Sequence, residues 1–240
     1  MKLIDFFERV YAINLPSRKD RHRMIVQELK KAGMPPKPNK VEIFPAIRPN
    51  DAGDFPSIGA RGCFESHLTI LKQAQADRLT NVLIVEDDLK ISEQFRSEQA
   101  VLLDRLCRTD WDFVYFGHIE PVAKTGGVTL EPFSGPLRTT HFYAVNGKIL
   151  DRLVWFLEEV KRRPPGHPDG GPMHIDGAYS TLRSQNPDIV TLIASPNLGS
   201  QQSSRSDIAS NAWFDRLPVF MEMASLARTG KQLLTAGSFR

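Results

Sequence analysis

Val82-Leu83-Ile84-Val85-Glu86-Asp87-Asp88 is the stretch that decides the fold. Its four aliphatic residues, three of them β-branched, are typical of a strand that is buried on both faces, as in a parallel sheet. Three carboxylates follow at the carboxyl end of that strand, where an open α/β sheet places its ligand site. The stretch therefore predicts an α/β domain with an acidic cluster at the ligand-binding edge of its sheet.

Three carboxylates at one strand end repel one another, and protonation, basic partners or a divalent cation would relieve the repulsion. Carboxylate oxygens suit Mg²⁺ or Mn²⁺, and such an ion can bridge to the phosphates of a nucleotide. A metal–diphosphate site is therefore one interpretation of Glu86 to Asp88. A strand that ends in a solvated acidic turn explains this segment, taken alone, at least as well.

The charge of the chain is unevenly distributed. The 240 residues are 41% hydrophobic and 25% charged, which is ordinary for a globular protein with one large domain or two small ones. The net charge is +3, but residues 1–40 hold ten Lys and Arg against four Asp and Glu, which gives +6 there and −3 elsewhere. A basic segment facing an acidic strand end would suit a phosphate ester and a metal. A solvated basic helix face accounts for most of these lysines.

Several protein classes receive little support. The two cysteines, Cys63 and Cys107, show no zinc-binding or CxxC spacing, so a disulfide scaffold is not expected and a reducing compartment is. Early charges interrupt the N-terminal apolar residues, and no apolar run is long enough to span a bilayer. The basic residues lack interleaved aromatics, which argues against nucleic acid as a partner. We expect a cytoplasmic protein.

The segment upstream predicts a strand–turn–helix unit. Residues 10–15 are a predicted strand, and Ser17 is predicted to cap the following helix. The N-terminus of a helix attracts anions. Arg18 and Arg21, one turn apart, could face the same anion, and Asn14 in the turn could bind a base or a ribose. For each arginine, an ordinary surface position is the alternative.

Further strands and helices alternate downstream, as in an α/β fold. Residues 118–137 show little periodicity and are predicted to be a binding loop or disordered. The glycine- and proline-rich residues 161–173 are predicted to be an irregular lid. The predicted strands are 41–44, 112–117, 139–145 and 189–193, and the predicted helices cover about 58–74, 92–107, 147–160 and 176–182. We expect a single domain over residues 1–210 and a helical C-terminal tail over 211–240.

Two positions have both a chemical and a structural interpretation. Cys63 and His67 lie four residues apart on one helix face, as a Cys–His nucleophilic pair would. A small core thiol beside a histidine that binds a loop is the better explanation, because nothing nearby would lower the pKa of the thiol. Asp176 near a helix start could be an ordinary cap.

The ordered set of motifs resembles glycosyltransferase family 25, which includes bacterial lipooligosaccharide galactosyltransferases and collagen-modifying relatives. The resemblance covers about residues 9–208. It is carried by Ile13-Asn14-Leu15 with Arg18, Asp20 and Arg21, by Gly62-Cys63 with Ser66-His67, by Val82 to Asp88, by His141 to Gly147, by Asp176, and by Pro196 to Ile208.

The resemblance implies an α/β, GT-A-like domain with a mixed, mostly parallel sheet flanked by helices, and a Mn²⁺- or Mg²⁺-dependent inverting transfer. It implies metal ligands at Asp88 and Glu86, with His174 and Asp176 as further candidates, and Asp176 as the catalytic base. Gly177 stands after Asp176 where the family has a bulkier residue, which leaves the acceptor and the donor sugar open. The implied donor-binding residues are Asn14, Leu15, Arg18, Arg21, Ser66, His67, Glu86, Asp87 and Asp88.

The expected function is transfer of a sugar, galactose by the resemblance, from a UDP-sugar to a hydroxyl of a cell-surface glycan or lipid-linked glycan. The absence of a signal peptide fits the bacterial branch, and a peripheral contact with the inner membrane stays open. One alternative is an inactive nucleotide-sugar-binding protein. Another is a receiver-like signalling domain, but the strand 112–117 ends in Gly117-His118, without the acid that such a domain phosphorylates.

Overall fold

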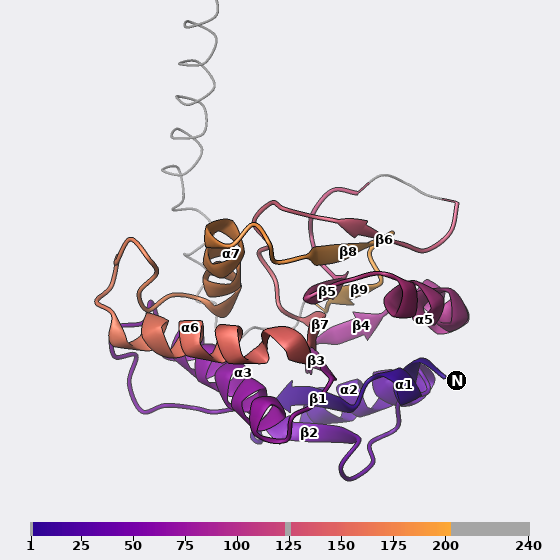
Figure 1. Cartoon of the computed structure of the whole chain (residues 1–240). Coiled ribbons are helices and arrows are strands. Elements are labelled where there is room, and N and C mark those ends of the chain that lie inside the picture. The colour runs from indigo at the N-terminus through magenta and orange to yellow at the C-terminus, as the bar shows by residue number, and fades with distance from the viewer. Residues whose placement is uncertain (1, 123–125, 203–240) are drawn as a thin grey trace, which may run out of the picture. The chain divides into compact units, whose positions relative to one another are not determined.

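The computed structural model describes residues 2–122 and 126–202, which lie within one compact unit, Met1–Ser204. A sheet with the strand order β2-β1-β3-β7-β5-β8-β6 runs through this unit, and the short strands β4 and β9 pair beside it (Figure 1). The predicted tail over residues 211–240 lies outside the described residues. The strands are β1 (Arg9–Asn14), β2 (Val41–Pro45), β3 (Asn81–Glu86), β4 (Leu89–Ile91), β5 (Phe113–Gly117), β6 (Thr129–Pro132), β7 (Phe142–Asn146), β8 (Thr191–Ser195) and β9 (Gly199–Gln201).

The sheet is mixed, and most of its strands point the same way. β1 pairs in parallel with both β2 and β3, whereas β7 lies antiparallel between β3 and β5. β5 therefore runs in the same direction as β3, and β8 follows it in parallel, while β6 runs the opposite way on the edge. The structure confirms the predicted α/β fold with a mostly parallel sheet flanked by helices.

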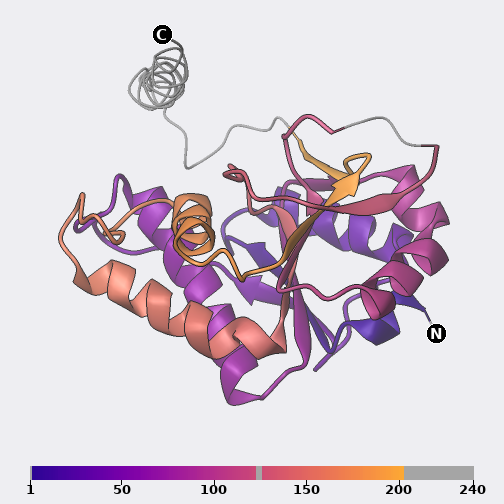
Figure 2. The ribbon, with the colours of Figure 1, turned by 45° about the horizontal axis from the view of Figure 1, so that its top comes forward.

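Helices cover both faces of the sheet (Figures 1 and 2). On one face, the core contains side chains from α3, α6 and α7. On the other, it contains side chains from α1, α2, α4 and α5. Among the described residues, no helix combines the length and the apolar character needed to cross a membrane. The helices are α1 (Leu3–Phe6), α2 (Lys19–Lys31), α3 (Ile58–Ala76), α4 (Glu93–Ser97), α5 (Gln99–Arg108), α6 (Leu150–Arg162) and α7 (Ile175–Gln185).

The central strand β3 contributes alternate residues to the two cores. Val82 and Ile84 pack in the core with α3, and Leu83 and Val85 pack in the core with α2. This follows from the pleat of a strand, which sends successive side chains to opposite faces. The same alternation at the end of β3 directs Glu86 and Asp87 toward different helices.

The predicted N-cap of α2 is wrong by one residue. The helix begins at Lys19 with Arg18 as its N-cap, rather than with Ser17 as the cap. The reason is a competing interaction, because Arg18 binds the carboxylate of Asp20 through Nε and Nη2 at 3.1 and 2.9 Å.

Two other segments also differ from the prediction. The helix expected over 92–107 is divided into α4 and α5 at Glu98, whose carboxylate accepts a hydrogen bond from Val128 N at 3.0 Å. The expected loop over 118–137 contains β6, which pairs with β8. Four residues are too few to show a strand period, so β6 was not visible in the sequence.

Candidate functional site

The site begins where the adjacent parallel strands β1 and β3 end. Ile13 lies opposite Glu86 in the register, so the turn at Asn14 and the acids after β3 come out of the sheet at the same edge. α2 follows β1 after a short turn and brings Arg21 to that edge. The side chain of Arg21 therefore lies at the acidic strand end and not at the ordinary surface position that the sequence left open.

Asp87 is the acid that faces α2, and it has two close partners. Arg21 Nη1 lies 3.0 Å from Asp87 Oδ1, and Asn14 Nδ2 donates to Asp87 Oδ2 at 2.7 Å. The side chains of Arg21 and Asp87 are each about 10% exposed. A buried carboxylate with a cation and an amide on its two oxygens is stable in its charged form. The structure therefore joins Asn14 and Arg21 to Asp87.

Glu86 is directed to the opposite face, toward α3. Its Oε1 accepts a hydrogen bond from Thr140 Oγ1 at 2.9 Å and lies 3.6 Å from His67 Nε2. Burial would raise the pKa of Glu86, but the His67 ring, the charge of His141 and the Thr140 hydroxyl outweigh it and hold the pKa below its ordinary value. Glu86 is therefore a charged carboxylate at neutral pH.

Asp88 is the carboxylate with the least compensation. Its Oδ1 is buried and has no hydrogen-bond partner within residues 2–122 and 126–202, and its Oδ2 lies 3.7 Å from Arg21 Nη1. Burial and the charges of Glu86 and Asp87 raise the pKa of Asp88 to about 7, although Arg21 and Gln201 act in the opposite direction. Asp88 thus has an oxygen that needs a cation or a proton.

The start of α7 approaches the same acids. Asp176 Oδ1 accepts a hydrogen bond from Gly177 N at 2.8 Å, and burial and the charge of Glu86 raise the pKa of Asp176. His174, the N-cap residue of α7, acts on Asp176 in the opposite direction. A carboxyl group with a raised pKa next to a charged cluster is suited to accept a proton.

Cys63 is surrounded by acids and is not an activated nucleophile. Burial raises the pKa of its thiol well above the ordinary value, and the charges of Glu86, Asp176 and Asp88 raise it further. A thiol in these surroundings stays protonated at neutral pH, whereas a nucleophilic cysteine needs a lowered pKa. The Cys63–His67 pair is therefore better explained as a core thiol beside a histidine than as a catalytic nucleophile and its base.

Sequence reasoning missed a chain of tyrosines behind His67. Tyr143 OH lies 2.8 Å from His67 Nδ1 and 2.8 Å from Tyr179 OH, and all three side chains are buried. Tyr143 also stacks on Tyr115. In the sequence these tyrosines are aromatic residues in apolar segments, which predict only a core. Thr140, which binds Glu86, was likewise hidden in a strand-like run.

Ser66 lies close to the site, but its hydroxyl group is hydrogen-bonded to the backbone. Its hydroxyl donates to Gly62 O at 2.6 Å and accepts from Ile47 N at 2.9 Å, and the side chain is fully buried. A Cβ on Gly62 would lie 2.5 Å from Ile47 O, so the glycine permits this close approach of the loop. Ser66 therefore holds the loop at residue 47 against α3.

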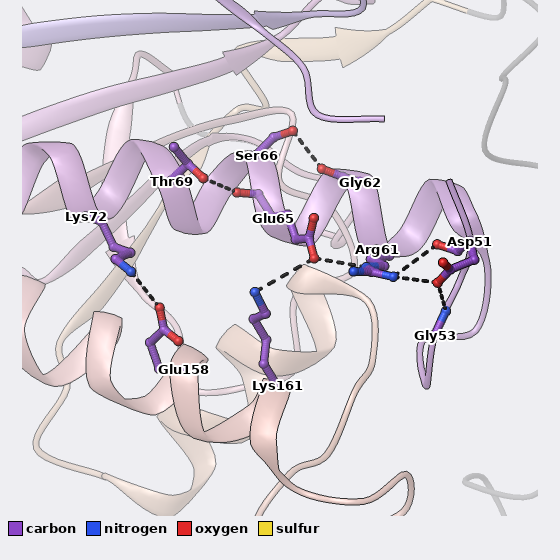
Figure 3. Close-up of polar contacts among 10 residues, drawn as sticks. All are labelled: Asp51, Gly53, Arg61, Gly62, Glu65, Ser66, Thr69, Lys72, Glu158 and Lys161. Atoms are coloured by element: carbon purple, nitrogen blue, oxygen red, sulfur yellow. Dashed lines mark hydrogen bonds and ion pairs between the residues drawn. The ribbon is translucent and has the colours of Figure 1, made fainter. Parts of the chain in front are cut away.

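Ion pairs on the outer side of α3 attach it to α6 (Figure 3). Glu65 lies between Arg61 Nε at 3.0 Å and Lys161 Nζ at 3.8 Å, and Lys72 Nζ lies 2.9 Å from Glu158. Lys161 stands at the end of α6, where the predicted lid begins, and residues 163–174 contain no helix or strand. That this segment closes over a ligand stays a prediction.

The remaining predicted donor residues lie beside the acidic cluster. Leu15 accepts a backbone hydrogen bond from Arg18 N at 2.8 Å and so forms the turn into α2. The guanidinium of Arg18 binds Asp20, as described above, and Asn14 Nδ2 also reaches Arg18 O at 3.3 Å. The structure thus brings Asn14, Arg21, His67 and the acids together, and places Leu15 and Arg18 in the turn next to them.

The residues at the strand end fit a hard divalent cation. Asp88 offers a buried oxygen that has no hydrogen-bond partner, and Glu86 offers a second carboxylate next to it. Oxygen ligands of this kind suit Mn²⁺ or Mg²⁺. Asp87 is a weaker candidate, because Arg21 and Asn14 already occupy its two oxygens.

Comparison with known proteins supports the resemblance seen in the sequence. Human procollagen galactosyltransferase 2 is 21% identical over 199 residues, which cover 75% of this chain and 31% of the relative. The human inactive glycosyltransferase 25 family member 3 is 30% identical over 79 residues, which cover 32% of this chain and 13% of the relative. The chain thus spans about a third or less of the length of these relatives.

Among solved structures, a glycosyltransferase involved in the glycosylation of the major capsid of PBCV-1 aligns with a TM-score of 0.41 and 11% identity, over 82% of this chain and 93% of that one. Residues 7–120 match the family described as glycosyltransferase family 25 (LPS biosynthesis protein). This segment contains the turn at Asn14, the Cys63–His67 helix and the acids after β3. Over this segment, just under half of the chain, the protein is similar to glycosyltransferase family 25.

Proposed function

We propose that this protein is a glycosyltransferase that moves a sugar from a UDP-sugar to a hydroxyl group of a glycan acceptor, with inversion at the sugar. The match of residues 7–120 to glycosyltransferase family 25 supports the reaction class, and the names of relatives that are procollagen galactosyltransferases favour galactose as the sugar. The observation that carries the proposal is the buried Asp88 oxygen without a partner, next to Glu86 and at the carboxyl end of β3.

Asp88 and Glu86 would hold Mn²⁺ or Mg²⁺, which supplies positive charge for the diphosphate leaving group. Arg21 pairs with Asp87 and lies 3.7 Å from Asp88, so it positions the carboxylates and adds positive charge at the same edge. Asn14 fixes the second oxygen of Asp87. In this arrangement the basic helix orients the acids rather than binding the nucleotide alone.

Asp176 would act as the base that takes the proton from the attacking hydroxyl. An inverting transfer needs a base at the acceptor, and Asp176 has a raised pKa and stands at the start of α7, within the influence of Glu86. Residues 161–173 would exclude water from the donor. A cytoplasmic location, a lipid-linked acceptor and a peripheral contact with the inner membrane stay predictions from the sequence.

The first test replaces Asp88 with Ala and measures UDP binding by titration calorimetry with and without Mn²⁺. We expect the wild-type protein to bind UDP in a metal-dependent manner and the variant to lose about 100-fold or more in affinity, because a direct ligand is removed. Asp104→Ala is the matched control, since Asp104 is an exposed acid on α5. Unchanged metal-dependent binding in Asp88→Ala would refute the assignment.

The second test replaces Asp176 with Asn and measures transfer to an acceptor glycan. Base catalysis typically contributes about 10²–10⁴-fold, so turnover should fall by this factor while the affinity for UDP stays within about twofold. A large loss of UDP affinity in a folded variant would instead assign Asp176 to the metal. Full turnover in Asp176→Asn would exclude both roles.

A catalytically inactive nucleotide-sugar-binding protein is the second candidate. The observation that favours it is the match to family members that are named inactive. The two candidates differ in product, because only a transferase releases UDP at a rate that depends on the acceptor. UDP that binds with Mn²⁺ but is never released from a UDP-sugar, with a range of glycan acceptors, would favour the inactive binder.

A further inference from the structure

A sulfur, a nitrogen and a carboxylate oxygen meet between α3 and the end of β3. Cys63 lies one helical turn before His67, and both side chains face Glu86. The Cys63 Sγ, a ring nitrogen of His67 and a carboxylate oxygen of Glu86 all lie within 4.8 Å of one another. The distance from His67 Nε2 to Glu86 Oε1 is 3.6 Å, which is longer than a normal hydrogen bond.

The His67 ring is oriented toward this point and lacks a partner there. His67 is fully buried, and its Nδ1 is bound to Tyr143 OH at 2.8 Å. Its Nε2 is buried and has no hydrogen-bond partner among the described residues. A histidine that ligates a metal has this arrangement, in which the distal ring nitrogen is fixed by a hydrogen bond and the other faces the ion.

We propose that Cys63, His67 and Glu86 form a binding site for a borderline-soft divalent cation such as Zn²⁺. Thiolate, imidazole and carboxylate are the three ligand types that Zn²⁺ uses in proteins. Two ligands at about 2.0–2.3 Å from one tetrahedral zinc ion lie about 3.3–3.8 Å apart, which includes the His67–Glu86 distance. Three protein ligands leave a fourth position open.

This site differs in chemistry from the carboxylate site at Asp88. A sulfur ligand selects against Mg²⁺ and Mn²⁺, which prefer oxygen. The two sites share Glu86, so Zn²⁺ held by Cys63 and His67 would withdraw that carboxylate from Asp88. The inference does not depend on the proposed transfer reaction, because Cys63 and His67 are needed only for binding the ion. When it binds, the thiol proton is released to solvent and the sulfur becomes a thiolate.

The test uses Co²⁺ as a spectroscopic substitute for Zn²⁺ in the full chain, without UDP or acceptor. We expect saturable near-ultraviolet absorption from sulfur-to-cobalt charge transfer at one equivalent of Co²⁺, and its loss when Zn²⁺ is added. Cys63→Ser should lose this absorption, whereas Cys107→Ser, which removes the exposed second cysteine, should keep it. Glu86→Gln should weaken the affinity for Co²⁺ at least ~10-fold, which is the smallest loss typical even for residues that only hydrogen-bond to a metal ligand.

The proposal is overturned if folded wild-type protein shows no charge-transfer absorption, or if the absorption survives in Cys63→Ser and disappears in Cys107→Ser.

A second measurement applies if the Cys63→Ser variant does not fold. In wild-type protein, Zn²⁺ should slow alkylation of Cys63 by iodoacetamide at least tenfold, as mapped by peptide mass spectrometry, and should leave the alkylation of Cys107 unchanged. Equal rates at Cys63 with and without Zn²⁺ would also overturn it. Either result leaves the metal-dependent UDP binding at Asp88 as a separate question.

Discussion

The two faces of the sheet treat the acids after β3 differently. On the face covered by α2, Asp87 is bound by Arg21 and Asn14 through both of its oxygens. On the face covered by α3, Glu86 lies near a histidine and a thiol. Asp88, which follows in the chain and lies 3.7 Å from Arg21, has a buried oxygen without a hydrogen-bond partner among the described residues. The first arrangement is complete without a ligand, and the second is not. Ligand binding is therefore expected where charge compensation is missing, rather than wherever acids gather.

The largest effect on the free energy of unfolding is expected at Arg21. Replacing Arg21 with Met would leave Asp87 buried with only Asn14 as its partner, and breaking a buried ion pair in this way typically costs about 3–5 kcal/mol. Urea unfolding should show a loss of this size in the free energy of unfolding. Arg108→Met is the matched control, because Arg108 pairs with Asp104 on the surface and is expected to contribute less than about 1 kcal/mol.

A double variant separates pairing from packing at this position. If the cost of Arg21→Met arises from the unpaired charge of Asp87, then adding Asp87→Asn should recover most of the lost free energy of unfolding. Equal instability in the single and double variants would mean that the guanidinium acts through packing. Charge compensation of Asp87 by Arg21 would then not explain the stability of the α2 face.

The sequence was sufficient to predict which residues gather at the strand end, but not how they pair. The apolar run before Glu86 predicted β3 and the position of the acids. The strand–turn–helix unit predicted that Arg21 lies near the start of a helix, with either an anion or solvent facing its side chain. The pleat also implies opposite directions for Glu86 and Asp87. Which helix lies on each face depends on the tertiary fold, so the pairing of Glu86 with His67 could not be predicted.

Short strands and aromatic residues account for most of what the sequence did not reveal. β4, β6 and β9 have three or four residues each, too few for a strand period to be recognised. Tyr143 and Tyr179 look like ordinary core residues, because an apolar segment gives no sign that their hydroxyl groups meet. The β4–β9 pair nevertheless matters for the site, because the side chain of Gln201 in β9 acts to lower the pKa of Asp88.

The incomplete face should show itself in the dependence of stability on pH. Burial raises the pKa of Asp88 from 3.8 to about 7, so the folded protein holds this proton more tightly than the unfolded chain does. Between about pH 4 and pH 7, Asp88 therefore makes the folded state progressively less stable as the pH rises. About three pKa units correspond to an upper limit of about 4 kcal/mol.

The measurement compares the free energy of unfolding of wild-type protein and Asp88→Asn from pH 4 to pH 8. The variant should gain stability relative to wild type as the pH rises, and Asp104→Asn, an exposed control on α5, should run parallel to wild type. At pH 8, saturating Mn²⁺ should stabilise wild-type protein and not Asp88→Asn. Parallel curves for wild type and Asp88→Asn would show that Asp88 is compensated after all, and would remove the difference between the two faces.

The smallest effect on the free energy of unfolding is expected for the buried tyrosines on the α3 face. The test compares a hydroxyl group that is hydrogen-bonded with one that is not. Tyr143→Phe removes the hydroxyl group that binds both His67 and Tyr179, and leaving these buried partners unpaired should cost about 1–3 kcal/mol of the free energy of unfolding. Tyr115→Phe is the matched control, because the buried Tyr115 hydroxyl has no hydrogen-bond partner in the described part of the chain and its removal should be neutral or stabilising. Equal losses in the two variants would mean that the tyrosines act only through packing, and that His67 is not held toward Glu86 by Tyr143.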